Sequence, residues 1–180
     1  MVDKQAIIKR LTENHQEFVA CIERLPAEEF NKSQNDKWTA GQQLEHIYLS
    51  VKPVNLAFKL PTFLLKLIWG KANRASRNYD ELIERYHAKL ANGSKATGPF
   101  VPKNVDLKKG QELKANLKNV VSKLCLSLDT YSEVELDQYI LPHPLLGKLT
   151  LREMLFFTIY HVKHHENLII NQVSERPFQK

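Results

Sequence analysis

The sequence YHVKHH, at residues 160–165, carries the histidines most able to do chemistry. His161 and His165 are four residues apart, and on an α-helix such residues lie on one face with Cβ atoms about 5–6 Å apart. Neutral imidazole nitrogens are good ligands for zinc, nickel, copper and iron. The spacing therefore predicts that His161 and His165 bind one metal ion. His164 lies about 60° away around the helix, at the edge of the same face, and is the weaker candidate.

A third histidine, His46, is predicted on the inward face of an earlier helix. It lies about 10 Å from the start of that helix, and His161 lies about 16 Å from the start of the last helix. In an up-down-up-down bundle these two helices run parallel, so we expect the histidines at similar depth. Three nitrogen ligands leave positions open for water or substrate, which is typical of catalytic metal sites. The alternative is a structural histidine pair that backbone groups or water satisfy.

Capping motifs mark where the helices that carry these histidines begin. Thr150 and Glu153 have the spacing of a capping box, and Thr39 and Gln42 form a second one. Both boxes precede apolar residues at three- and four-residue spacing, which is the pattern of an amphipathic helix. The histidines fall on the apolar side and are therefore predicted to point into a core.

The same periodicity predicts the remaining architecture. Helices are expected at residues 3–25, 39–60, 61–69, 79–90, 106–128 and from Thr150 onward, with no strand. The predicted fold is all-α, one domain over residues 1–180. It is a four-helix up-down-up-down bundle with a long irregular, partly helical connection between helices 2 and 3.

The other polar residues near these helices offer weaker candidates. His15 lies on the apolar face of the first helix, where a single histidine is more often a hydrogen-bonded core residue than a ligand. His87 lies among charged residues and is expected to be exposed. Glu45 and Glu166 adjoin predicted ligands but point about 100° away from them. The sequence therefore shows no clear general base, and the choice of a carboxylate that orients an imidazole stays open.

The composition excludes several classes of protein. The chain has 180 residues, a net charge of +6 and 43% hydrophobic residues, which suits one helix-rich domain. No apolar run is long enough to span a bilayer, and the N-terminus lacks the apolar core of a signal peptide. We therefore expect a cytoplasmic protein without a membrane partner. The excess of Lys and Arg lies in residues 71–130 without a nucleic-acid motif, so no nucleic-acid partner is expected. Cys21 and Cys125 are expected as buried thiols.

Apolar residues on the back of the last helix bear on the oligomeric state. Phe156, Ile159 and Ile170 lie on the side that faces away from the core stripe. Such residues need cover, which either the irregular segment 61–105 or a second subunit can supply. We therefore expect a homodimer, and a small molecule as the substrate.

The motifs described above also resemble a known family. Trp38-Thr39 followed by His46, and HPLLGKLTLREMLFFTIYHVKHHENLI from His143 onward, are similar to the DinB-like superfamily, in its variant with an HP-x-x-G stretch before the final helix. The resemblance covers nearly the whole chain. It implies a four-helix bundle, often a homodimer, with His46, His161 and His165 as ligands of a divalent metal ion, usually zinc or nickel. It also implies that His143 is structural, because the chain turns at this stretch into the last helix.

The resemblance implies several activities. Members with assigned activity are similar to S-transferases that use bacillithiol or mycothiol, or to a mycothiol-dependent isomerase, and others are called metal-dependent hydrolases. Our first hypothesis is therefore a metal-dependent thiol S-transferase or hydrolase, with a low-molecular-weight thiol as one substrate in the transferase case. The alternative is a non-catalytic stress-related or interaction bundle in which the metal ion is structural. A third possibility is a bundle without metal.

Overall fold

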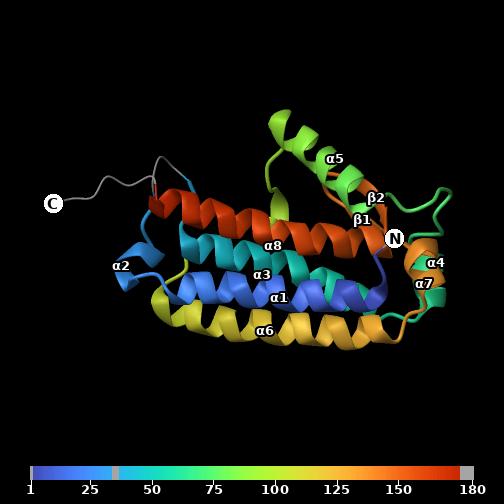
Figure 1. The fold of residues 1–180 in the computed structure, drawn as a ribbon, viewed down its shortest axis with the longest axis horizontal. Helices are drawn as coiled ribbons and strands as arrows, with labels where there is room; N and C mark the ends of the chain where they lie inside the picture. The colour runs from blue at the N-terminus through green and yellow to red at the C-terminus, as the bar shows by residue number, and fades with distance from the viewer. Residues whose placement is uncertain (1, 34–36, 175–180) are drawn as a thin grey trace.

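The computed structural model describes residues 2–33 and 37–174, and most of them are helical (Figure 1). The long helices are α1 (Lys4–Glu23), α3 (Ala40–Phe58), α6 (Leu107–Asp129) and α8 (Leu151–Ser174). The shorter elements are α2 (Ala27–Phe30), α4 (Thr62–Ile68), α5 (Tyr79–Ala91), η1 (Gly98–Phe100), α7 (Glu133–Gln138), β1 (Ile140–His143) and β2 (Gly147–Thr150). No helix in the described ranges is long and apolar enough to cross a membrane.

The two helices that carry the candidate ligands begin at the capping boxes that the sequence predicts. Thr39 Oγ1 accepts the amide of Gln42 at 3.1 Å, and Gln42 Oε1 accepts the amide of Thr39 at 3.0 Å. At the start of α8, Thr150 Oγ1 accepts the amide of Glu153 at 3.2 Å, and Glu153 Oε2 accepts the amide of Thr150 at 2.9 Å. Each box satisfies backbone donors that a helix start leaves open, so the first residue of each helix is well defined.

Helices α3 and α6 run in the same direction. Their first turns both pack on the ring of Phe30, and a Cβ atom added at Gly41 or Gly110 would lie 2.8 or 2.5 Å from that ring. Only glycine permits this close approach. At the other end, the Tyr131 hydroxyl that follows α6 donates to the carbonyl of Phe58 at the end of α3, 3.3 Å away. The two helices therefore start together and end together.

Helices α1 and α8 run in the opposite direction to α3 and α6. Lys4, at the start of α1, donates to the carbonyl of Asp129 at the end of α6 at 2.7 Å. Arg152, at the start of α8, donates to the carbonyl of Val2 just before α1 at 3.0 Å. The four long helices thus follow an up-down-down-up order (Figure 1).

The predicted all-α four-helix bundle is confirmed, but the up-down-up-down order of directions is not the one that the chain adopts. The connection of residues 59–106 explains the difference. It is long enough to carry the chain from the end of α3 back to the end of the bundle where α3 began, as Figure 1 shows. A short connection would have placed consecutive helices antiparallel.

A small β-hairpin precedes α8, and the prediction of no strand was wrong. Strands β1 and β2 pair antiparallel, from Ile140 opposite Thr150 to His143 opposite Gly147. Gly147 has a φ of 76°, which glycine adopts without strain. Each strand has only four residues, too few to show a period of two in the sequence.

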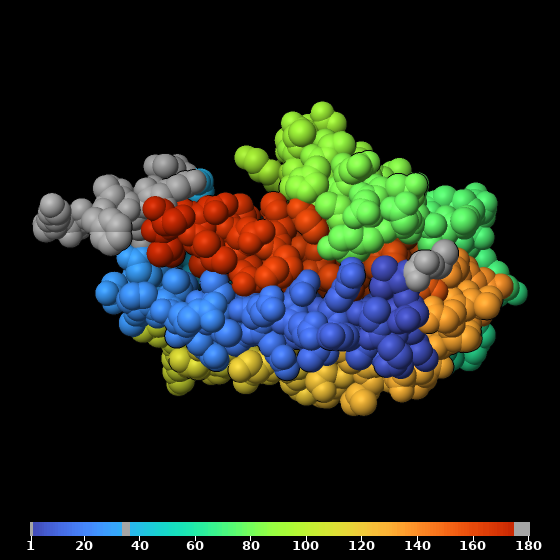
Figure 2. Space-filling view, viewed as in Figure 1, coloured from blue at the N-terminus to red at the C-terminus, as the bar shows by residue number. Residues whose placement is uncertain are grey.

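Helix α5 packs on the back of α8 and supplies cover for its apolar residues. Phe156 and Ile159 are each only 2% exposed, whereas Ile170 is 46% exposed. The ring of Tyr79 in α5 lies 5.7 Å from that of Phe156. Figure 2 shows α5 lying over part of α8 on this face. The segment 61–105 is thus the cover for Phe156, whereas Ile170 stays exposed, and the homodimer remains a prediction.

Candidate metal centre

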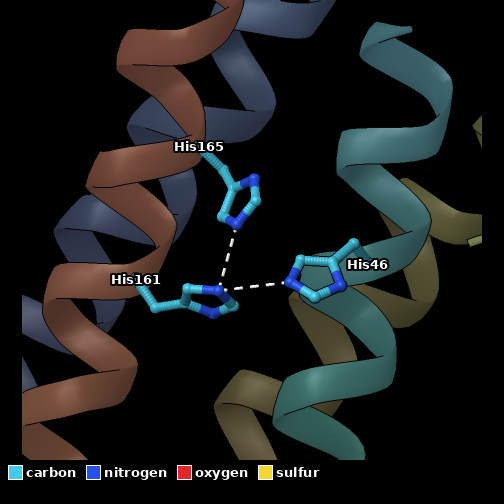
Figure 3. Close-up of side chains that lie close together, drawn as sticks. All are labelled: His46, His161 and His165. Carbon is cyan, nitrogen blue, oxygen red and sulfur yellow. Dashed lines mark hydrogen bonds between the residues drawn. The ribbon is translucent and has the colours of Figure 1, made fainter. Parts of the chain in front are cut away.

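Three imidazoles from α3 and α8 point toward one another inside the bundle (Figure 3). The Nε2 atom of His161 lies 3.2 Å from Nε2 of His46 and 3.0 Å from Nε2 of His165. Each of the three residues is 5% exposed. Nitrogen ligands bind zinc at about 2.0–2.1 Å, so two ligands of one ion lie about 2.9–3.4 Å apart. The predicted ligands His46, His161 and His165 therefore form the only group of this kind among the described residues.

The outer nitrogens of two of these rings bind carbonyl oxygens. Nδ1 of His46 donates to the backbone carbonyl of Phe100 at 2.6 Å. Nδ1 of His165 donates to the side-chain amide oxygen of Gln43. A carbonyl oxygen only accepts, so Nδ1 carries the proton in both rings and Nε2 carries a lone pair. Such partners fix the orientation and tautomer of imidazoles that ligate metals.

These tautomers leave a deficit of protons at the centre of the cluster. The lone pairs of His46 and His165 both face Nε2 of His161, which offers one proton at most. Without a cation, at least one buried lone pair stays unsatisfied, and such a group is costly. A divalent ion accepts all three lone pairs at once. The donor set and its spacing therefore fit a metal ion such as zinc or nickel.

The electrostatic surroundings keep the three histidines neutral. Burial and the neighbouring imidazoles hold the pKa of His161 and that of His165 well below the ordinary value of 6.5. Burial also lowers the pKa of His46, against the effect of its hydrogen bond to Phe100, which raises it. At neutral pH all three rings are therefore in the form that binds metal.

The ligands meet for a reason that differs from the predicted one. Because α3 and α8 run antiparallel, equal distance from the two helix starts does not place residues side by side. His46 lies in the first half of α3, and His161 and His165 lie on either side of the middle of α8, so the antiparallel pair brings them to one level. The structure brings the three predicted residues together, but the parallel helix pair used to support their meeting is wrong.

The remaining histidines lie outside the cluster. His15 is 3% exposed, and its Nδ1 binds the carbonyl of Leu11 at 2.7 Å, so it is a core residue as predicted. His87 is exposed, as predicted, and its Nε2 lies 2.6 Å from the Tyr160 hydroxyl. His164 is half-buried, and its ring lies 5.2 Å from that of His165 without joining the cluster.

His143 makes the turn contacts that agree with the structural role implied by the resemblance. Its Nδ1 accepts the amides of Leu145 and Leu146, both at 3.1 Å, and so closes the turn of the β-hairpin. Its ring packs edge-on against Phe157 at 4.2 Å. Burial lowers the pKa of His143 to about 4, so the ring stays neutral and keeps accepting at Nδ1.

The two carboxylates next to the ligands point elsewhere, as their helical positions predicted. Glu45 accepts the backbone amide of Lys103, and Glu166 pairs with Lys163 at 2.8 Å. The orienting groups that the sequence did not identify are Gln43 and the carbonyl of Phe100. Gln43 lies three residues before His46, and that spacing could have revealed it. The Phe100 carbonyl is a backbone group in an irregular segment and has no sequence signal.

The three histidines lie on the wall of a cavity of about 1020 Å³ between α3 and α8. The segment of residues 94–101, here called the strap, closes one side, and α5 and the β-hairpin contribute to the wall. Apolar side chains form most of the lining, among them Val51, Val54, Trp69, Leu90, Leu141 and Phe157. No Asp or Glu belongs to the lining among the described residues, whereas Lys37, Lys95 and His164 do. The cavity is therefore apolar with a few basic groups.

The sequence matches the family model of the DinB superfamily over residues 10–169. The chain belongs to the DinB superfamily. No curated protein matches it significantly. The bundle, the histidine cluster and the family assignment thus agree, and the resemblance seen in the motifs is confirmed.

Solved structures of similar fold support the architecture of this DinB-superfamily protein. YfiT from Bacillus subtilis, described as "a probable metal-dependent hydrolase with an unusual four-helix bundle topology", has a TM-score of 0.61 and 17% identity, with 95% of this chain and 87% of that chain covered. A conserved protein from Enterococcus faecalis has a TM-score of 0.60 and 15% identity, with 94% of each chain covered. A protein from Clostridium difficile 630 has a TM-score of 0.59 and 12% identity, with 98% and 99% covered. At these identities the likeness establishes the fold.

Proposed function

We propose that this DinB-superfamily protein is a metal-dependent enzyme that transfers a low-molecular-weight thiol to an electrophilic small molecule. One observation carries the proposal: three neutral imidazoles direct their Nε2 atoms to one point on the wall of a large cavity. Three ligands leave positions open on the cavity side, whereas a closed structural site has four. YfiT is described as a probable metal-dependent hydrolase, which agrees with the metal dependence proposed here and with the second candidate reaction, hydrolysis.

The chemistry of a bound divalent ion is that of a Lewis acid, which lowers the pKa of a coordinating thiol or water. His46, His161 and His165 hold the ion, and Gln43 and the Phe100 carbonyl keep two of the rings in the ligating tautomer. The fit rests on the lone pairs that face one another, and zinc and nickel both accept three imidazoles.

The cavity lining offers the same kind of base to thiol transfer and to hydrolysis. No described Asp or Glu lines this cavity, so a neutral histidine is the side chain available to accept the proton in either reaction. In thiol transfer the sulfur forms a bond to an electrophilic carbon, the leaving group departs with its electron pair, and the thiol proton goes to a neutral base or to solvent. His164, half-buried in the lining, is placed to take that proton.

Hydrolysis is the second candidate because His164 can also accept a proton from water. Burial lowers the pKa of His164, so its ring is neutral at pH 7 and able to accept a proton. In this reaction the carbonyl carbon of an ester or amide gains the water oxygen, and the alcohol or amine leaves with a proton.

Activity measurements on metal-loaded protein test the proposal. Conjugation of bacillithiol or mycothiol to an aryl halide supports the transferase, and turnover of esters or amides without thiol supports the hydrolase. The variant His161→Ala should lose either activity by at least about 10³-fold, whereas His87→Ala, which removes a histidine outside the cluster, should retain it. Equal activity in the His161→Ala variant would refute both reactions.

A purely structural metal ion gives a different result. Metal removal would then lower the melting temperature while no thiol, ester or amide is turned over. Elemental analysis of protein never exposed to chelator distinguishes a third case, because less than about 0.1 ion per chain contradicts a resident metal.

A further inference from the structure

Helix α4 presents apolar side chains to solvent at one end of the bundle (Figure 1). Phe63, Leu67 and Ile68 are 66%, 79% and 55% exposed. Phe63 and Leu67 are four residues apart and share one face of the helix. Leu65 is fully buried and anchors the helix to the core. The apolar face is therefore held outward by the fold.

The charged residues of the segment that includes this face are all basic. Residues 46–79 contain no Asp or Glu. They contain exposed lysines that no described ion pair joins to a carboxylate: Lys52, Lys59, Lys66 and Lys71. The arginines of the segment, Arg74 and Arg77, instead bind the buried carboxylate of Glu153 at 2.6 and 3.1 Å. The lysines therefore give the end of α3 and α4 an uncompensated positive charge.

The acidic residues of the neighbouring helix α7 already have partners of their own. Glu133 and Asp137 each bind the guanidinium of Arg152 at 2.7 Å. Glu135 accepts from Ser132 at 2.8 Å in the cap of α7. No described ion pair joins these carboxylates to Lys59, Lys66 or Lys71.

A helical face of exposed apolar residues among lysines matches the surface of an anionic bilayer. We propose that the docking surface, defined as α4 with Leu56 and the lysines 52, 59, 66 and 71, binds membranes that contain anionic phospholipids. The apolar side chains enter the boundary between headgroups and acyl chains, and the ammonium groups contact lipid phosphates. From the sequence we expected no membrane partner because no segment spans a bilayer, but a peripheral contact requires no span.

A second copy of the chain is a worse match for the docking surface. A symmetric dimer through α4 would bring Lys59 and Lys66 close to the same residues of the other copy, and like charges repel. A stable dimer also buries about 800 Å² on each partner. Helix α4 has seven residues, and few apolar side chains surround it.

The docking surface adjoins the cavity of the histidine cluster. Leu56, Leu60 and Trp69, which flank α4 in the sequence, belong to the cavity lining. Docking through α4 therefore brings this end of the cavity to the bilayer, where apolar molecules concentrate. The docking itself depends on no metal ion and no turnover, so it can be measured separately from the proposed enzyme activity.

Vesicle co-sedimentation of the full chain tests the docking surface. Vesicles of phosphatidylcholine with about 30% phosphatidylglycerol are compared with vesicles of phosphatidylcholine alone, at low and high salt. The double variant Phe63→Ser/Leu67→Ser removes the apolar contact. The matched control, Leu107→Ser/Leu126→Ser, changes two residues that are 48% and 70% exposed on α6.

We expect binding to the anionic vesicles that weakens with salt, a loss of at least about tenfold in the Phe63→Ser/Leu67→Ser variant, and no loss in the control. The His161→Ala variant should bind vesicles like the unchanged protein. Absence of binding to anionic vesicles, or equal loss in both double variants, overturns the proposal. A shift from dimer to monomer in the α4 variant without vesicle binding overturns it as well, in favour of a second copy.

Discussion

The imidazole of His46 donates through Nδ1 to the backbone carbonyl of Phe100, 2.6 Å away, and thereby joins the ligand on α3 to the strap. The Nε2 atom of this ring thus faces the histidine cluster, and its Nδ1 atom binds the strap that closes one side of the cavity. We expect metal-free His46→Ala to show faster amide hydrogen exchange in residues 94–103 than the unchanged protein. Metal-free His161→Ala is the control, because it loses a ligand and keeps this hydrogen bond. Equal exchange in the two variants would contradict the link.

Gln43 should matter for metal affinity although it is not a ligand. Its amide oxygen accepts from Nδ1 of His165 and fixes the tautomer that ligates. Gln43→Leu removes this acceptor, and we expect a 10- to 100-fold loss of metal affinity in competition with a chromogenic chelator. Gln111→Leu, at an exposed position of α6, should leave the affinity unchanged. If both variants bind equally well, the ring of His165 does not depend on Gln43.

Metal affinity should depend on pH in one direction only. Burial and the neighbouring imidazoles hold the pKa values of His161 and His165 well below 6.5, so protons do not compete for these rings at neutral pH. We expect titration calorimetry to give constant affinity, after correction for buffer, from pH 8 through 6.5, and an affinity that falls only at pH values well below 6.5, where these depressed pKa values are reached. An affinity that already falls between pH 8 and 6.5 would show that the histidines titrate like exposed imidazoles and would contradict their burial.

His15 should make the fold sensitive to acid. Burial lowers its pKa to about 4, against a hydrogen bond to the Leu11 carbonyl that raises it, while the unfolded chain titrates at 6.5. The contribution of His15 to the free energy of unfolding is therefore fully present above pH 6.5 and is lost as the pH falls from 6.5 toward 4. The loss at pH 4.5 is about 2.5 kcal/mol. In denaturant unfolding of chelator-treated protein, the free energy of unfolding should change less between pH 7 and pH 4.5 in the His15→Leu variant than in the unchanged protein, by about this amount. An identical pH dependence in both proteins would exclude His15 as the cause.

The buried carboxylate of Glu153 should be critical for stability. Its side chain is fully buried and binds Arg74 and Arg77, which come from the long connection. Glu153→Gln leaves two guanidinium groups without their counter-charge, and we expect a loss of roughly 3 kcal/mol in denaturant unfolding. Glu13→Gln, which breaks the exposed pair with Lys9, should cost less than about 0.5 kcal/mol. Similar losses in the two variants would show that burial adds nothing to the Glu153 pairs.

Local signals explain why the clustering of the three histidines could be predicted from the sequence. The capping boxes at Thr39 and Thr150 and the four-residue spacing of His161 and His165 act within one helix, so a single sequence reveals them. His46 was assigned by its inward position, and the structure brings it to the other two.

Features that depend on contacts between distant segments could not be predicted in the same way. The parallel course of α3 and α6 depends on the path of the connection and on the fit of Phe30 against Gly41 and Gly110. The bond from His46 to the Phe100 carbonyl involves a backbone atom, which no residue type encodes. Strand β1 has four residues and contains Pro142, which disfavours a strand in any local reading.

The scarcity of acidic groups around the cavity has a consequence for what enters it. No described carboxylate lines the wall, whereas Lys95 and the three clustered histidines do. With a dication bound, the interior carries excess positive charge in a medium of low dielectric constant. The cavity then attracts negatively charged small molecules and repels cationic ones. Small anions should therefore act as competitive inhibitors.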